Sequence, residues 1–108
     1  GVGNIFNAPI KSGTSSYEFI DVFEGKILEN IDKFKPEVIL VSAGFDAHRD
    51  DPMAELNWSA EDYAWLGGFL SEISKEGPDN QILAVLEGGY NLDALAVSCG
   101  EFITAFHL

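Results

Sequence analysis

Cysteine is nearly absent from this chain, which has only Cys99 among its 108 residues. A single cysteine excludes an internal disulfide framework and is typical of proteins from a reducing compartment. No apolar run approaches the roughly 18 residues that span a bilayer. The N-terminus also lacks the basic, apolar and small-residue regions of a signal peptide. The sequence therefore predicts a cytoplasmic protein without a membrane partner.

Basic residues are also scarce, because 6 lysines and arginines stand against 18 acidic residues and give a net charge of −12. Proteins that bind nucleic acid need basic patches to neutralise phosphates, so no nucleic-acid partner is expected. The charge permits a cationic partner, such as a polyamine or a lysine-rich peptide. The alternative is that the acidic residues form a solvated, solubilising surface.

Apolar residues make up 46% of the chain, which is ordinary for a folded domain. They fall into units in which a strand-like run is followed by apolar residues at helical spacing. Ser15 with Glu18 matches a capping box, and Ser59 can cap a later helix. Alternating strands and helices predict a parallel sheet. We expect a single partial α/β domain over residues 1–108, three-layered, with about three helices and three strands at residues 4–10, 38–42 and 82–86.

Two polar side chains follow two of these strands, at the point where each run stops at glycine. Asp46 comes after Gly44 and Phe45, and Tyr90 comes after Gly88 and Gly89. Ligands in open α/β sheets gather at the carboxyl ends of the strands, so both side chains are expected in one crevice. An aspartate is a hard oxygen ligand for a metal, and a tyrosine hydroxyl can donate a hydrogen bond to developing negative charge.

Each of these residues also has a simpler interpretation. Asp46 can be a loop aspartate that accepts backbone N–H bonds, and Tyr90 can pack under the last helix. His48 has the spacing of a second metal ligand on the same loop, although a solvent-facing histidine is the simpler expectation. Residues 50–52 are most simply a turn with Asx-type bonds to the backbone, and Cys99 is expected in the core.

Two longer motifs resemble the zinc-dependent histone deacetylase family, including its acetylpolyamine amidohydrolase relatives. Ser-Ala-Gly-Phe-Asp-Ala-His-Arg-Asp-Asp-Pro-Met at residues 42–53 and Leu-Glu-Gly-Gly-Tyr-Asn-Leu at residues 86–92 look like two C-terminal signatures of that family, closest to its class II branch. The resemblance covers essentially the whole chain. It implies a C-terminal section of the arginase/deacetylase fold, whose parent chemistry hydrolyses acetyl-lysine or acetylpolyamine amides.

The resemblance also implies a role for each matching residue. Asp46 corresponds to the last zinc ligand, and Tyr90 to the catalytic tyrosine that hydrogen-bonds the substrate carbonyl and then the oxyanion. Gly88 and Gly89 correspond to glycines that line the narrow acyl-lysine channel, and Met53 corresponds to an apolar wall residue of that channel. His48 matches no ligand of the family.

The departures from the family pattern lead to three hypotheses. The family's other zinc ligands, an Asp-x-His pair, and its paired histidines have no counterpart, since the only histidines here are His48 and His107. The chain is therefore expected to be a truncated piece that binds no zinc tightly alone, lacks activity, and needs a missing N-terminal deacetylase segment. The second hypothesis is a self-associating, non-catalytic α/β binding or structural module, a homodimer or higher oligomer. The third is an enzyme that borrows ligands from another chain.

Overall fold

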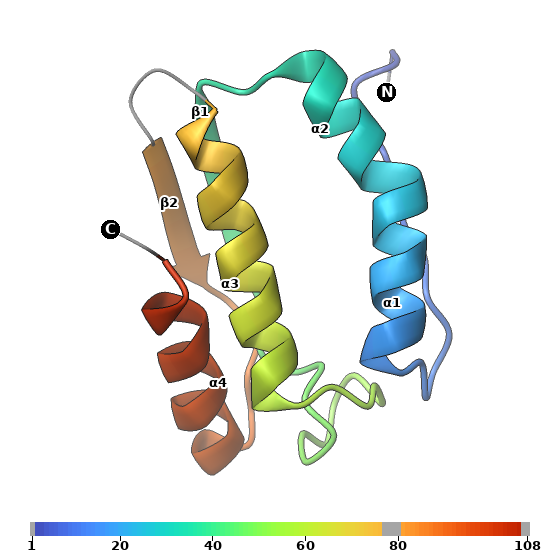
Figure 1. Cartoon of the computed structure of the whole chain (residues 1–108). Helices are drawn as coiled ribbons and strands as arrows, with labels where there is room; N and C mark the ends of the chain where they lie inside the picture. The colour runs from blue at the N-terminus through green and yellow to red at the C-terminus, as the bar shows by residue number, and fades with distance from the viewer. Residues whose placement is uncertain (1, 77–80, 107–108) are drawn as a thin grey trace.

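A computed structural model describes residues 2–76 and 81–106 of the chain. A long helical stretch comes first, and strand then alternates with helix to the C-terminal end (Figure 1). This order confirms the predicted α/β class. The elements are, in chain order, α1 (Ser16–Phe23), η1 (Glu24–Leu28), α2 (Glu29–Phe34), β1 (Val38–Ala43), α3 (Ala60–Lys75), β2 (Gln81–Leu86) and α4 (Leu92–Thr104).

The strands β1 and β2 pair in parallel, as the sequence predicts. Their register runs from Val38 opposite Gln81 to Ala43 opposite Leu86. The intervening helix α3 carries the chain back to the start of the second strand, which is the connection that parallel strands require. The carboxyl ends of both strands therefore lie at the same end of the sheet.

The prediction of a strand at residues 4–10 is wrong. This segment forms no strand, and most of its residues are exposed. A strand needs a neighbour that completes its backbone hydrogen bonds, and Pro9 removes one of the donors of this segment. The segment instead runs beside the long helical stretch (Figure 1). The turn that follows is fixed where the Gly13 N–H donates to the Glu55 carbonyl at 2.7 Å.

The helices begin where the sequence predicts. The Glu18 carboxylate accepts the Ser15 N–H at 2.9 Å, which completes the capping box of α1. Ser59 and Asp62 form the same arrangement at α3, where the Asp62 carboxylate accepts the Ser59 N–H at 2.7 Å. The five-residue turn of π-helix, η1, was not predicted. It contains Gly25, whose low helix propensity makes the helix easier to distort there.

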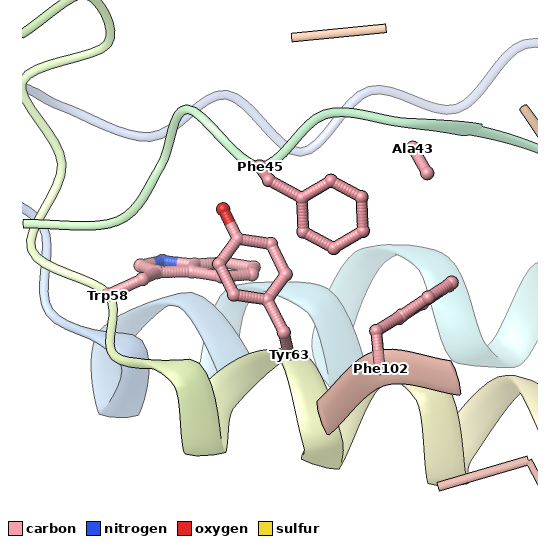
Figure 2. Packing of buried hydrophobic residues seen from close by; sticks show 5 residues of the cluster. All are labelled: Ala43, Phe45, Trp58, Tyr63 and Phe102. Atoms are coloured by element: carbon pink, nitrogen blue, oxygen red, sulfur yellow. The ribbon is translucent and has the colours of Figure 1, made fainter. Parts of the chain in front are cut away.

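The core lies between the helices α3 and α4 and the first strand. It joins residues from both helices, the end of β1 and the connecting loop (Figure 2). The helices α3 and α4 are in close contact at Gly67. Only a glycine allows this approach, because a Cβ at that position would clash with the backbone carbonyl of Phe102. Cys99 packs against this core and is partly buried, as expected. The fully buried members of the cluster are Ala43, Phe45, Trp58, Tyr63 and Phe102.

The faces of the two-stranded sheet differ in burial. Along β1, residues that face the helices alternate with exposed ones, and the exposed Leu40 retains 74% of its accessible surface. On β2, Leu83 and Val85 are also more than half exposed. Three layers were predicted. The described residues form two of them, the sheet and one layer of helices. None of the helices described here is long and apolar enough to cross a membrane.

Candidate functional site

The loops that follow β1 and β2 remain paired beyond the last strand residues. The Glu87 N–H donates to the Ala43 carbonyl at 2.9 Å, and the Phe45 N–H donates to the Gly88 carbonyl at 2.8 Å. The ring of Phe45 is buried beside Tyr63 and Phe102, which anchors the first loop to the helices (Figure 2). This pairing brings Asp46, the next residue, close to Gly88 of the second loop.

The Asp46 carboxylate lies against two glycines. A Cβ added to Gly88 would lie 2.7 Å from Asp46 Oδ1, and a Cβ added to Gly44 would lie 2.9 Å from the same atom. A larger residue at either position would displace the carboxylate. Within residues 2–76 and 81–106, no group donates a hydrogen bond to this carboxylate and no cation pairs with it. Its oxygens are therefore free to bind a group from outside these residues.

The loop aspartate that accepts backbone N–H bonds is Asp51, not Asp46. Asp51 is only 8% exposed. Its Oδ1 accepts the Met53 N–H at 3.0 Å, which confirms the predicted Asx-type turn. Its Oδ2 accepts the Tyr90 N–H at 2.7 Å and the Asn91 N–H at 3.1 Å. Burial acts to raise the pKa of Asp51, but the three N–H donors bring this pKa below its ordinary value.

Tyr90 does not pack under the last helix, because its side chain is 58% exposed. The residue before it, Gly89, has a φ of 141°, a backbone conformation that favours glycine, and a Cβ there would lie 2.9 Å from Leu95. The residue after it, Asn91, caps α4 by accepting the Ala94 N–H at 3.0 Å. The backbone of Tyr90 is thus fixed while much of the residue is exposed.

The structure corrects the expectation for His48. This histidine is buried, with 8% of its surface exposed, and does not face solvent. Its Nδ1 accepts the Asp50 N–H at 3.1 Å, which uses the lone pair that a metal would need at that nitrogen. The burial follows from the connecting loop, whose backbone folds back so that the Arg49 N–H donates to the Trp58 carbonyl at 2.9 Å.

Metal ligands in this part of the chain are too few for a complete site. Among the residues that the structure describes, no three His, Cys, Asp or Glu side chains come together. His107 lies outside the described residues. A carboxylate such as that of Asp46 is a suitable zinc ligand, but a catalytic zinc keeps three protein ligands. Asp46 therefore fits as one ligand of a zinc site and does not make one alone.

Two buried aromatic residues lie in the core beside the loop that connects β1 to α3. Trp58 and Tyr63 contact each other with ring centroids 5.2 Å apart (Figure 2). Burial raises the pKa of the Tyr63 hydroxyl well above its ordinary value, so this phenol stays neutral. Of the two tyrosines near the carboxyl ends of the strands, Tyr90 is exposed and Tyr63 is buried.

A hollow in the described residues lies between the long helical stretch and β1. Its volume is about 850 Å³, and neither Asp46 nor Tyr90 lines it. The lining is mostly apolar and includes Leu40 of β1 and Phe34 at the end of α2. This hollow is therefore separate from the carboxyl ends of the strands, where Asp46 and Tyr90 lie.

Gly88→Ala tests the close approach between Asp46 and the second loop. We expect the substitution to lower the free energy of unfolding by about 1–3 kcal/mol, because an added methyl group overpacks the site. Urea unfolding measures the change. Gly68→Ala is the matched control, since a Cβ at Gly68 in α3 meets nothing within 4 Å and alanine favours a helix by about 1 kcal/mol. Equal stability of Gly88→Ala and the parent would contradict the packing described for Asp46.

Comparisons with known proteins give one consistent family. The family model described as "Histone deacetylase domain" matches residues 1–106. The chain is 36% identical over 106 residues to "Histone deacetylase 10, chloroplastic" of Oryza sativa, covering 98% of this chain and 24% of that protein. The chain thus spans about a quarter of the length of that relative. The name of this relative places it in the chloroplast, so the cytoplasmic location expected here stays a prediction.

Solved structures agree with this similarity. The acetylpolyamine aminohydrolase of Burkholderia pseudomallei superposes with a TM-score of 0.79 at 27% identity, over 93% of this chain and 28% of that one. The histone deacetylase Clr3 superposes with a TM-score of 0.86 at 27% identity, over 96% of this chain and 17% of that one. The parallel pair of strands and the helices around it are therefore a section of the deacetylase fold.

Proposed function

Because this chain belongs to the histone deacetylase domain family, we propose that Asp46 and Tyr90 serve one metal-dependent active site that hydrolyses acetyl amides. The observation that carries this proposal is the uncommitted Asp46 carboxylate, which lies against Gly88 two residues before an exposed Tyr90. A structural aspartate would be satisfied by local donors, as Asp51 is. A carboxylate left free beside an exposed hydroxyl at the strand ends is typical of a reaction site.

Asp46 would hold a zinc ion together with ligands from outside the described residues. When bound, such an ion acidifies a water molecule and polarises the amide carbonyl. The resemblance assigns the remaining ligands to a separate Asp-x-His pair on an earlier strand. The only Asp-x-His of this sequence is Asp46 to His48, and it consists of Asp46 itself and a buried histidine whose Nδ1 already accepts a hydrogen bond. Gly44 and Gly88 leave room for the Asp46 carboxylate in its present position, because a Cβ at either glycine would lie less than 3.0 Å from Asp46 Oδ1.

Tyr90 would donate a hydrogen bond to the oxyanion that forms when the amide carbonyl is attacked. Gly88 and Gly89 offer a wall without side chains, and Met53, which is 63% exposed, offers an apolar surface beside them. These features suit a linear acyl chain better than a bulky substrate. The net charge of −12 favours a substrate whose other groups are cationic, so we propose an acetylated lysine within a basic peptide, or an acetylated polyamine, as the substrate class.

Removal of metal tests the reaction class. We expect the full-length gene product to release acetate from an acetyl-lysine peptide or an N-acetylpolyamine, to lose this activity after chelation, and to regain it with added zinc. The 108-residue chain alone is expected to bind no zinc tightly and to release no acetate, because one carboxylate does not hold a catalytic zinc. Activity of the full-length protein that persists after complete metal depletion would contradict the proposal.

A second candidate function, self-association, is favoured by the exposed apolar surface of the sheet. β1 pairs only with β2 among the described residues, so its other edge has unpaired backbone groups. Leu40 and the 850 Å³ hollow beside it extend this apolar surface. An open edge of this kind is a template for pairing with another chain. We therefore propose that the 108-residue chain by itself forms a homodimer through β1.

Sedimentation equilibrium at micromolar concentration measures this association. We expect a species of twice the monomer mass of 11.8 kDa. Leu40→Lys should shift the chain toward the monomer, because it places a charge on the exposed face of β1. Tyr17→Lys, on the exposed side of α1, is the control and should leave the dimer intact. A single 11.8 kDa species for the unmodified chain would rule the dimer out.

A further inference from the structure

We propose that Asp51 is a positioning residue of this site, which sets the place of Tyr90 by accepting backbone N–H bonds from both loops. The inference rests on the proposed role of Tyr90 in the reaction. It adds a residue whose side chain reaches neither metal nor substrate. The Asp51 carboxylate joins Met53 in its own loop to Tyr90 and Asn91, which lie 39 and 40 residues further along the chain.

The exposure of Tyr90 makes its backbone the main determinant of where its hydroxyl lies. A side chain that is 58% exposed has few contacts to hold it. The bond that fixes the backbone at this residue is the 2.7 Å bond from the Tyr90 N–H to Asp51 Oδ2. Hydrogen bonds to a charged acceptor are roughly twice as strong as neutral ones, so this anchor is firm.

Further hydrogen bonds of Asn91 hold the second loop on two sides. Asn91 donates from Nδ2 to the Asp50 carbonyl at 3.0 Å and caps α4 through Oδ1. The second loop is consequently held to the first loop on one side and to α4 on the other. Asp51 is the only one of these acceptors that also contacts the wall residue Met53, at its N–H. One carboxylate therefore sets the relative positions of the hydroxyl donor and the proposed channel wall.

Hydrogen exchange on the 108-residue chain tests the anchor. In Asp51→Asn, at least one of the three backbone N–H groups faces an amide NH2, which cannot accept a hydrogen bond. We expect the amide or amides that face the NH2, either that of Met53 or those of Tyr90 and Asn91, to exchange about tenfold faster or more, with the amides within β1 and β2 unchanged. Asp50→Asn is the matched control, because its carboxylate is exposed and bonds none of these amides. Unchanged exchange at all three amides, those of Met53, Tyr90 and Asn91, in Asp51→Asn would overturn the proposal.

A measurement on the unmodified chain covers the case in which Asp51→Asn does not fold. A scalar coupling through the hydrogen bond should connect the Tyr90 backbone nitrogen to the Asp51 side-chain carboxyl carbon. Detection of this coupling supports the anchor. Its absence in a spectrum that shows the equivalent couplings between β1 and β2 would overturn it.

A double-mutant cycle on the full-length gene product separates positioning from a general structural role. We expect Asp51→Asn to lower kcat by roughly 10- to 100-fold through misplacement of Tyr90, with little change in KM. In a Tyr90→Phe background the same substitution should have almost no further effect on kcat, because the hydroxyl is already gone. Additive losses would show that Asp51 does not act through Tyr90. A Tyr90→Phe variant with parental kcat would instead overturn the proposed role of Tyr90, while the exchange rates would still test the anchor.

Discussion

Asp46→Ala in the full-length gene product is expected to abolish tight zinc binding and, with it, acetate release. Loss of a residue that merely orients a metal ligand typically costs 10- to 100-fold in affinity or activity, and loss of a ligand itself should exceed this range. Among the described residues, no cluster of three metal-binding side chains exists. No such cluster near Asp46 is therefore available among these residues to take its place. Zinc content after dialysis and the rate of acetate release measure the two effects.

The matched control for this prediction is Asp50→Ala. Asp50 lies on the same loop, but its side chain is 67% exposed. We expect this variant to retain zinc and most of its activity, since removal of an exposed carboxylate at that position changes neither the crevice nor the glycines beside it. Equal zinc content in Asp46→Ala and the parent protein would remove Asp46 from the metal site.

Tyr90→Phe is expected to lower kcat on the order of 100-fold or more while KM changes little. Removal of one hydrogen-bond donor to a developing oxyanion typically has this cost. The effect falls on kcat because negative charge on the carbonyl oxygen is greatest in the transition state. Phenylalanine keeps the ring and the backbone bond to Asp51, so the loop should be undisturbed. Initial rates over a range of acetyl-lysine peptide concentrations give both constants.

Tyr17→Phe provides a control for loss of an exposed phenol. Tyr17 lies on α1 and is 84% exposed, and it lines neither the crevice nor the hollow beside β1. We expect its removal to leave kcat and KM at their parental values. A Tyr90→Phe variant that is as fast as Tyr17→Phe would exclude the Tyr90 hydroxyl from the reaction.

Local sequence pattern was sufficient for the features that depend on local physics. The β-branched runs of β1 and β2 correctly predicted parallel strands, although one face of β1 and most of β2 are exposed and not buried. The serines before α1 and α3 predicted capping boxes, because a cap is a contact across three residues. The closeness of Asp46 to the second loop is consistent with the sequence, since parallel strands that end at glycine place Asp46 and Gly88 at the same end of the sheet. These predictions required no knowledge of distant contacts.

Features that depend on distant partners could not be predicted in this way. Residues 4–10 alternate like a strand, but a strand also needs a neighbour, and the described residues offer none. The burial of His48 depends on the loop that returns as far as Trp58, which no local pattern reports. Asp51 was predicted only as a turn residue, because its bonds to Tyr90 and Asn91 cross about 40 residues of chain. The residue pattern that signals a turn is the same with or without such bonds.

The most direct test of the account is the position of zinc in the full-length gene product, located by anomalous scattering at the zinc absorption edge. We predict an anomalous peak at bonding distance from an Asp46 carboxylate oxygen, about 2.0–2.2 Å, with Tyr90 at the border of the same crevice. A fully occupied zinc site that does not include Asp46, or an Asp46 carboxylate that instead accepts only protein hydrogen bonds in the zinc-loaded crystal, would contradict the account.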